Sequence, residues 1–168
     1  PLIVTWHSDV IRQKSFLPVY MFFLKRLMKR VVKVIVATPY HLKSCPQLMA
    51  QQEAPTKTVV IPFGIDPELW QLTPSARKKA ESLRQAHSGE LLLFSFGRHV
   101  AYKGYVYLLE ALIQTDKVHL ILGGEGPLTP EFQEFIKTHG LGKKITLCGL
   151  IPQEKIPAYL AACDLFCF

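Results

Sequence analysis

Short apolar runs alternate with helix-like segments along this chain, and the alternation constrains the fold more than any other feature. The runs occupy residues 2–6, 34–37, 58–61, 91–95, 118–122, 144–148 and 164–168. Helices are expected between them, at residues 16–33, 39–52, 74–87, 104–115, 129–139 and 152–162. Most runs are continuously apolar, so both faces of each strand need cover. This pattern predicts an α/β fold with open parallel sheets.

A change of composition divides the series. Three prolines and a glycine cluster between residues 62 and 74, so we expect two Rossmann-like domains, 1–66 and 67–168. The chain starts without Met and stops within an apolar run. We therefore expect a fragment, with the end of one domain and most of the next.

The formal charge of +7 comes from one segment, because residues 10–52 hold eight Lys or Arg and no acid. An amphipathic helix is expected at 16–33. Its apolar side would carry Leu17, Tyr20, Leu24, Leu27, Met28 and Val31. Its other side is either a solvated outer face or a contact with an anionic membrane surface. The membrane candidates are Phe22, Lys25, Arg26, Lys29, Arg30 and Lys33. No RNA- or DNA-binding pattern accompanies them, so no nucleic acid partner is expected.

The four cysteines, at positions 45, 148, 163 and 167, do not form a zinc-binding set. We expect small buried hydrophobic residues in a reducing compartment and no metal site. No apolar run reaches the ~18 residues of a membrane span. The expected location is cytoplasmic. If the basic side of the helix contacts a membrane, the attachment would be peripheral, at the inner face.

Charged residues follow the strand at 91–95, in Gly97-Arg98-x4-Lys103-Gly104. In open parallel sheets, ligands bind beyond the carboxyl ends of the strands. Arg98 offers a bidentate fork and Lys103 a point charge, and a helix expected to begin near Gly104 favours the same anion. The segment predicts a diphosphate site, and the alternative is solvated surface charge.

Two further loops follow the next strands. Gly124 and Gly126 permit close backbone contact with a nucleotide, and Glu125 could accept hydrogen bonds from ribose hydroxyls; the alternative is a plain tight turn. Leu150 follows Gly149 and either borders a base or packs in the core. Thr129 replaces the third glycine of the dinucleotide fingerprint, which makes NAD binding a weak prediction.

Together these motifs resemble the retaining glycosyltransferases of the GT-B fold that include glycogen synthase and bacterial lipopolysaccharide mannosyltransferases. The resemblance covers essentially the whole chain, through the Gly97 and Gly123 loops, Gly149 and Ala162-Cys163-Asp164-Leu165-Phe166. Ile61-Pro62-Phe63-Gly64-Ile65-Asp66 is similar to the interdomain segment, although Phe63 replaces the usual Asn. The Glu-x7-Glu element of the family is expected beyond Phe168.

The resemblance implies a role for each matching residue. Arg98 and Lys103 would hold the donor diphosphate without an obligatory metal or cofactor, beside Gly97. The loop Gly124–Gly126 and Leu150 would border the nucleoside. His7, in Thr5-Trp6-His7-Ser8-Asp9, matches a cleft histidine that contacts the donor sugar or assists the acceptor. Its alternative is a hydrogen-bonded histidine at a strand end.

The expected parent enzyme is a hexosyltransferase that moves a sugar, with retention, from a UDP- or GDP-sugar to a glycan or lipid-linked acceptor. The setting implied is surface polysaccharide synthesis, and the isolated fragment is expected to be inactive. The alternatives are a non-catalytic nucleotide-binding module and a nucleotide-sugar epimerase on the same fold. An NAD oxidoreductase is disfavoured by Pro127 and Thr129.

Overall fold

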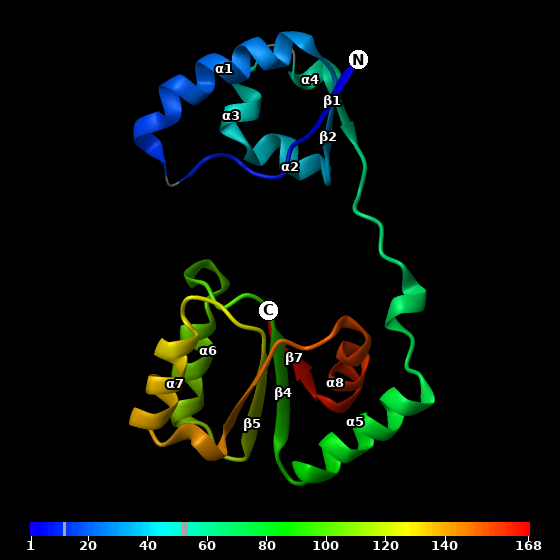
Figure 1. Ribbon diagram of the computed structural model, residues 1–168, viewed down its shortest axis with the longest axis vertical. Coiled ribbons are helices and arrows are strands. Elements are labelled where there is room, and N and C mark those ends of the chain that lie inside the picture. Colours follow the sequence, from blue (N-terminus) through cyan, green and yellow to red (C-terminus); the bar gives the residue numbers. More distant parts are fainter. Residues whose placement is uncertain (12, 52–53) are drawn as a thin grey trace. The chain divides into compact units, whose positions relative to one another are not determined.

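The computed structural model describes residues 1–11, 13–51 and 54–168, which form two compact units, Pro1–Ile65 and Asp66–Phe168. We call them unit 1 and unit 2 and describe each by itself (Figure 1). The domain boundary expected from the sequence, between residues 66 and 67, lies one residue after the boundary between these units.

Unit 1 contains a parallel three-stranded sheet in the order β1 (Leu2–Thr5), β2 (Val31–Val36) and β3 (Thr58–Val60). Helix α1 (Leu17–Arg30) joins β1 to β2. It packs through Leu24 and Met28 on the buried valines of β2. Three short helices precede β3, namely α2 (Pro39–Ser44), α3 (Pro46–Met49) and α4 (Ala54–Lys57).

Helix α1 is shorter than the expected helix at 16–33, which was wrong at its C-terminal end. The N–H of Val31 donates to the Leu27 carbonyl, and the backbone at Val31 is already extended. Val31 and Lys33 therefore belong to β2, and Lys33 is not on the basic face of the helix. Five of the six residues from Val31 to Val36 are β-branched, which favours a strand because those side chains lose rotamer freedom in a helix.

The single helix expected at 39–52 was also wrong. The structure has two helices there, α2 and α3, which are separated by Cys45. Pro46 is the first residue of α3, because proline has no N–H with which to continue the hydrogen bonds of α2. Its expected end at residue 52 lies outside the described residues. Its start is confirmed, since the His41 N–H donates to Thr38 Oγ1 over 3.0 Å.

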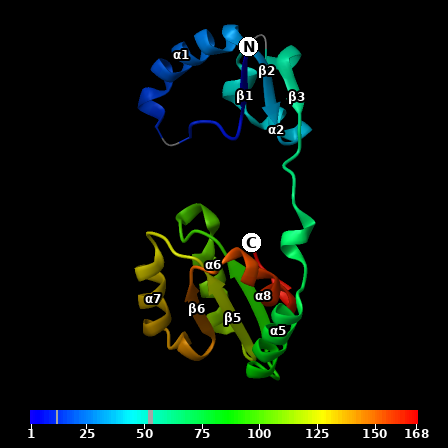
Figure 2. The same cartoon turned by 45° about the vertical axis from the view of Figure 1, so that its right-hand side comes forward.

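Unit 2 contains a parallel sheet in the order β6 (Ile145–Gly149), β5 (Val118–Gly123), β4 (Leu91–Phe96) and β7 (Leu165–Phe166) (Figure 2). Helices α6 (Tyr105–Ala111) and α7 (Thr129–Thr138) cover one face, and α5 (Pro74–Ala86) and α8 (Ile156–Ala162) cover the other (Figure 1). Helix α6 is shorter than the expected 104–115, because residues 112–114 form a 3₁₀ turn.

Successive residues of the central strands supply two separate cores. On one face, Leu120 and Leu122 pack with Leu109 of α6 and Phe132 of α7. On the other face, Ile121 packs with residues of α5 and α8. Because all six residues of β5 are buried, this strand holds the loops at its carboxyl end in fixed positions.

Candidate functional site

The loops after β4, β5 and β6 meet at the carboxyl edge of the unit 2 sheet. The Gly97 N–H donates to the Gly123 carbonyl over 3.1 Å, and the Gly124 N–H donates to the Gly149 carbonyl over 2.6 Å. An open pocket of about 780 Å³ lies over these contacts. It is lined by Phe96, Gly97, Arg98, Gly124, Glu125, Gly126, Thr129, Pro130, Leu150 and Ile151.

Two of the loop glycines allow this close approach. Gly124 has a φ of +106°, and a Cβ there would lie 2.0 Å from the Gly97 carbonyl oxygen. A Cβ on Gly126 would lie 2.5 Å from the His99 carbonyl oxygen. Neither position can hold a side chain without moving backbone, so glycine brings the β4 and β5 loops into contact.

The two predicted cations occupy neighbouring positions rather than one pocket. Arg98 is exposed and lines the large pocket. Lys103 lines an adjacent cavity of about 110 Å³, and its Cε lies 3.8 Å from where a Gly97 Cβ would be. Among the residues that the structure describes, neither side chain forms an ion pair. Both charges are therefore available to an anion.

The remaining predicted donor residues also border the pocket. Glu125 is exposed, and its Oε1 lies 3.2 Å from the position of a Cβ on Gly149, so the carboxylate faces the third loop. Leu150 is 73% exposed and lines the pocket, which excludes the core-packing alternative for this residue. The β5 and β6 loops thus add a carboxylate and an apolar wall.

Sequence reasoning missed two residues beneath the pocket. His99 is fully buried, and its N–H donates to the Glu125 carbonyl while its own carbonyl accepts from the Leu128 N–H. The hydroxyl of Thr129 accepts from the Gly126 N–H over 2.9 Å. In the sequence, Thr129 is distinguished only because it replaces the third glycine of the dinucleotide fingerprint. These two residues connect the β4 loop to the β5 loop.

The predicted histidine of the N-terminal part, His7, follows β1 in unit 1. Its exposed ring stacks on Phe63, with centroids 5.6 Å apart and an interplanar angle of 5°. Two hydrogen bonds fix its neighbour Trp6. The backbone N–H of Trp6 donates to the Ile35 carbonyl over 2.8 Å, and the indole Nε1–H donates to Asp9 Oδ1 over 3.1 Å. His7 lines an open groove of about 1040 Å³ between the end of β1 and α1. Phe63, which departs from the family pattern, therefore supports the His7 ring.

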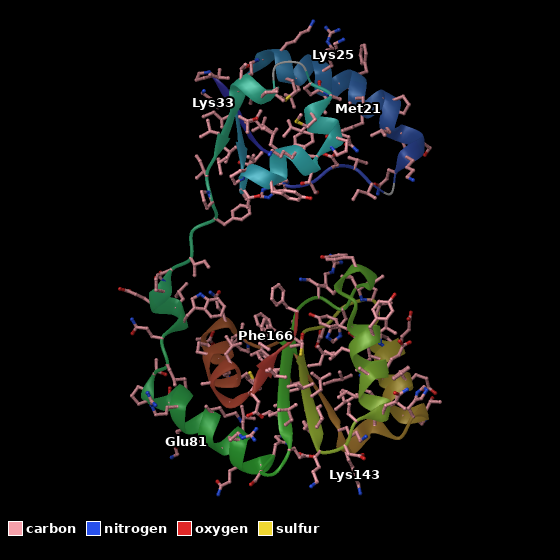
Figure 3. The ribbon with its side chains drawn as sticks, turned by 180° about the vertical axis from the view of Figure 1, so that it is seen from behind. Met21, Lys25, Lys33, Glu81, Lys143 and Phe166 are labelled. Carbon is pink, nitrogen blue, oxygen red and sulfur yellow. The ribbon has the colours of Figure 1, made fainter. Side chains whose placement is uncertain are left out.

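The outer side of α1 is both basic and apolar. Lys25, Arg26, Lys29 and Arg30 are exposed, and the Arg26 guanidinium lies 5.9 Å from the Phe22 ring centroid. The exposed apolar side chains are Phe16, Val19, Phe22, Phe23 and Leu27. Leu27 was expected on the packed side and is 40% exposed, because the packed side runs through Leu24 and Met28. Figure 3 shows Met21 pointing into the unit and Lys25 pointing away from it.

Within the described part of the chain, no helix is both long and apolar enough to pass through a membrane. All four thiols are free, but only Cys45 is fully buried and the other three are half-buried. Burial raises the pKa of each of these thiols.

Comparison with known proteins gives a consistent result. The family model for glycosyl transferases group 1 matches residues 77–168. The chain is 31% identical to the D-rhamnosyltransferase WbpZ of Pseudomonas aeruginosa, over 95% of the chain and 40% of that protein. It is 29% identical to the O-antigen chain mannosyltransferase C of Escherichia coli, over 90% of the chain and 38% of that protein. The chain spans about two fifths of the length of these relatives.

Among solved structures, the chain is similar to HepE of Anabaena in complex with UDP and glucose. The TM-score is 0.76 and the identity 26%, over 99% of this chain and 45% of that one. The fold is accordingly part of a GT-B arrangement with parallel α/β sheets.

Proposed function

This chain belongs to the glycosyl transferases group 1 family, and on that basis we propose that the unit 2 pocket binds the nucleoside diphosphate of a sugar donor. The observation that carries the proposal is the contact between the Gly97–Arg98 and Gly124–Gly126 loops over a pocket lined by Arg98, with Lys103 in the adjacent cavity. Among the described residues, neither cation forms an ion pair. HepE, whose structure is similar, is described in complex with UDP, which supports a nucleotide-sugar donor, either UDP- or GDP-linked.

The chemistry follows from the positions of the charges. The diphosphate leaves with growing negative charge, and Arg98 with Lys103 would stabilise it in place of a metal ion. The carboxylate of Glu125 would accept hydrogen bonds from the ribose hydroxyls, and Leu150 would border the base. Transfer would occur with retention, by attack of the acceptor on the face from which the diphosphate departs.

Unit 1 would supply the acceptor side of the parent enzyme. His7 lies beside an open groove at the carboxyl end of β1, a position from which an imidazole can orient a sugar or an acceptor hydroxyl. The D-rhamnosyltransferase and the O-antigen chain mannosyltransferase among the relatives favour a glycan or lipid-linked acceptor in surface polysaccharide synthesis.

The outer side of α1 would hold the enzyme against the cytoplasmic face of a membrane. Lys25, Arg26, Lys29 and Arg30 attract anionic headgroups at roughly 1 kcal/mol for each charge close to the surface. Phe22 and Phe23 are 59% and 62% exposed and can enter the interfacial region of the bilayer.

Calorimetric titration of the chain with UDP and with GDP tests the donor site. We expect one nucleotide to bind and Arg98→Ala to weaken that binding at least ~10-fold, the loss expected for one charge-assisted hydrogen bond. Arg77→Ala is the matched control, because Arg77 is an exposed residue of α5 away from the pocket. Failure of the wild-type chain to bind either nucleotide, or equal binding by both variants, would contradict the proposal.

A further inference from the structure

Three side chains that the donor pocket does not use converge at the opposite edge of the unit 2 sheet. His87 and Glu90 lie in the connection between α5 and β4, and His119 is the second residue of β5. One potential metal-ligand atom from each residue lies within 4.8 Å of the other two. The strands are parallel, so this cluster lies where β4 and β5 begin, while the donor loops follow their ends. Figure 3 shows Lys143, which precedes β6, at this edge of the sheet.

The cluster is built around one carboxylate oxygen. Glu90 Oε2 lies 3.3 Å from His87 Nδ1 and 4.0 Å from His119 Nδ1. Nitrogen and oxygen ligands of a tetrahedral zinc ion lie about 3.3 Å from one another. The first distance already has this value. The second exceeds it by roughly 0.7 Å, which rotation of the partly exposed Glu90 side chain can remove.

The hydrogen bonds of His119 suit a metal ligand. Its Nε2 lies 2.9 Å from Thr146 Oγ1, and its Nδ1 lies 3.1 Å from the Lys143 carbonyl oxygen. Nδ1 can donate to the Lys143 carbonyl in the metal-free chain. Metal binding requires the other tautomer, in which Nε2–H donates to Thr146 and the ion takes the place of the Nδ1 proton. Metal-binding histidines usually donate their second ring N–H to a polar group in this way. A cation at Nδ1 would also be attracted by the neighbouring carbonyl oxygen.

The charge of the surroundings also permits a cation. Two nearby basic side chains are already paired with acids. Lys144 Nζ lies 3.7 Å from Asp116, and the Arg84 guanidinium lies 2.8 Å from Asp164.

We propose that His87, His119 and Glu90 bind a divalent transition-metal ion of the zinc type, through the two Nδ1 atoms and the Glu90 carboxylate. Two imidazoles with one carboxylate suit zinc, cobalt and nickel better than calcium or magnesium, which prefer oxygen ligands. The ion would tie the end of α5 to β5 and thereby stabilise unit 2. This inference does not depend on the proposed glycosyltransferase activity.

The test is metal binding by the metal-free 168-residue chain, with Zn²⁺ as the titrant in calorimetry and thermal unfolding. We expect a saturable site that raises the unfolding temperature of unit 2. Glu90→Gln and His87→Asn should each weaken Zn²⁺ binding at least ~10-fold, since even outer partners of metal ligands contribute that much. His139→Asn is the matched control, because His139 is an exposed histidine of the same unit that caps α7.

The free thiols need a separate control, because cysteine also binds zinc. Titration with Co²⁺ distinguishes them, since thiolate ligands give a strong near-ultraviolet charge-transfer band and nitrogen and oxygen ligands do not. The proposed site predicts the visible bands of bound Co²⁺ without the thiolate band. No binding of Zn²⁺ by the wild-type chain, or equal affinity in Glu90→Gln and His139→Asn, would overturn the proposal.

Discussion

The Nδ1 atom of His99 lies 2.8 Å from Thr129 Oγ1, and this contact joins the loop after β4 to the first residue of α7. The same hydroxyl accepts from the Gly126 N–H, so one oxygen holds both a donor-loop amide and the buried imidazole. The Nε2 atom of His99 has no hydrogen-bond partner among the described residues. The order of the proposed nucleotide site therefore depends on Thr129, which also lines the pocket.

Replacement of Thr129 by valine should destabilise unit 2 by about 1–3 kcal/mol, the usual cost of leaving a buried polar group without its partner. Both the Gly126 N–H and His99 Nδ1 lose their partner, while the shape of the side chain is nearly kept. Urea unfolding measures the change. Thr138→Val is the control, because the Thr138 hydroxyl lies on the exposed side of α7 and makes a 3.4 Å contact with Glu134 Oε1. Equal stability of the two variants would contradict the structural role of the hydroxyl.

Substitution of Gly124 by alanine should cost at least ~2 kcal/mol, since a strained backbone and a steric overlap each contribute 1–3 kcal/mol. The added Cβ would meet the Gly97 carbonyl oxygen at 2.0 Å, with φ at +106°. We expect UDP binding to fall with stability, because the two donor loops must separate. Gly142→Ala is the matched control, as nothing lies within 4 Å of a Cβ there. A loss of less than about 0.5 kcal/mol in the free energy of unfolding of Gly124→Ala would show that the two loops can separate at little cost.

The positions of the loops at Gly97, Gly124 and Gly149 could be predicted from the sequence because each part of the signal is local. A buried strand, a glycine at its end and a charged or polar residue next to it are adjacent in the chain, as at Gly97 and Arg98. Parallel pairing then brings such loops to one edge of the sheet. The placement of Lys103 in a neighbouring cavity could not be predicted, since it depends on the 3₁₀ turn before Gly104.

The errors in unit 1 have a different origin. Hydrophobic periodicity continues from α1 into β2, because Val31 suits both the helix pattern and the strand. The β propensity of the residues from Val31 onward sets the boundary between α1 and β2. Lys33 therefore lies in the sheet and not on the basic face of the helix. No sequence motif indicated the cluster of His87, Glu90 and His119. His87 and His119 are far apart in the chain and meet only because β4 and β5 pair in parallel.

Removal of Arg98 from the pocket, or of Lys103 from the adjacent cavity, should impair the reaction of the full-length enzyme. Arg98→Ala or Lys103→Ala is expected to lower turnover at least ~100-fold, the range for loss of one preorganised charge contact in a transition state. Steady-state kinetics with the natural donor measures kcat and KM separately, and the loss should lie mainly in kcat. Lys79→Ala on the exposed side of α5 should leave both constants unchanged. A loss below twofold in both cation variants would refute their role.

Reversal of charge on α1 should release the chain from anionic membranes. Lys25→Glu with Lys29→Glu is expected to weaken binding to phosphatidylserine vesicles by at least ~10-fold, given roughly 1 kcal/mol for each basic side chain near the surface. Vesicle sedimentation measures this, with Lys78→Glu and Lys79→Glu on α5 as the charge-matched control. Equal binding of the wild-type chain to neutral and anionic vesicles would instead support a solvated outer face.

The stability of unit 2 should fall as the pH is lowered through the range in which histidine takes up a proton. Burial lowers the pKa of His99 below its ordinary value, so the unfolded chain binds a proton at a higher pH than the folded chain does. Stability is therefore complete above the unfolded pKa of about 6.5 and declines below it, and His99 contributes at most about 1.4 kcal/mol per pH unit to this decline. Burial also lowers the pKa of His119, which adds a second contribution of the same sign. Urea unfolding between pH 7.5 and roughly 5, above the ordinary range of carboxylates, measures the slope. His99→Gln should flatten the profile and His139→Gln should not; identical slopes in the two variants would show that His99 does not govern this decline.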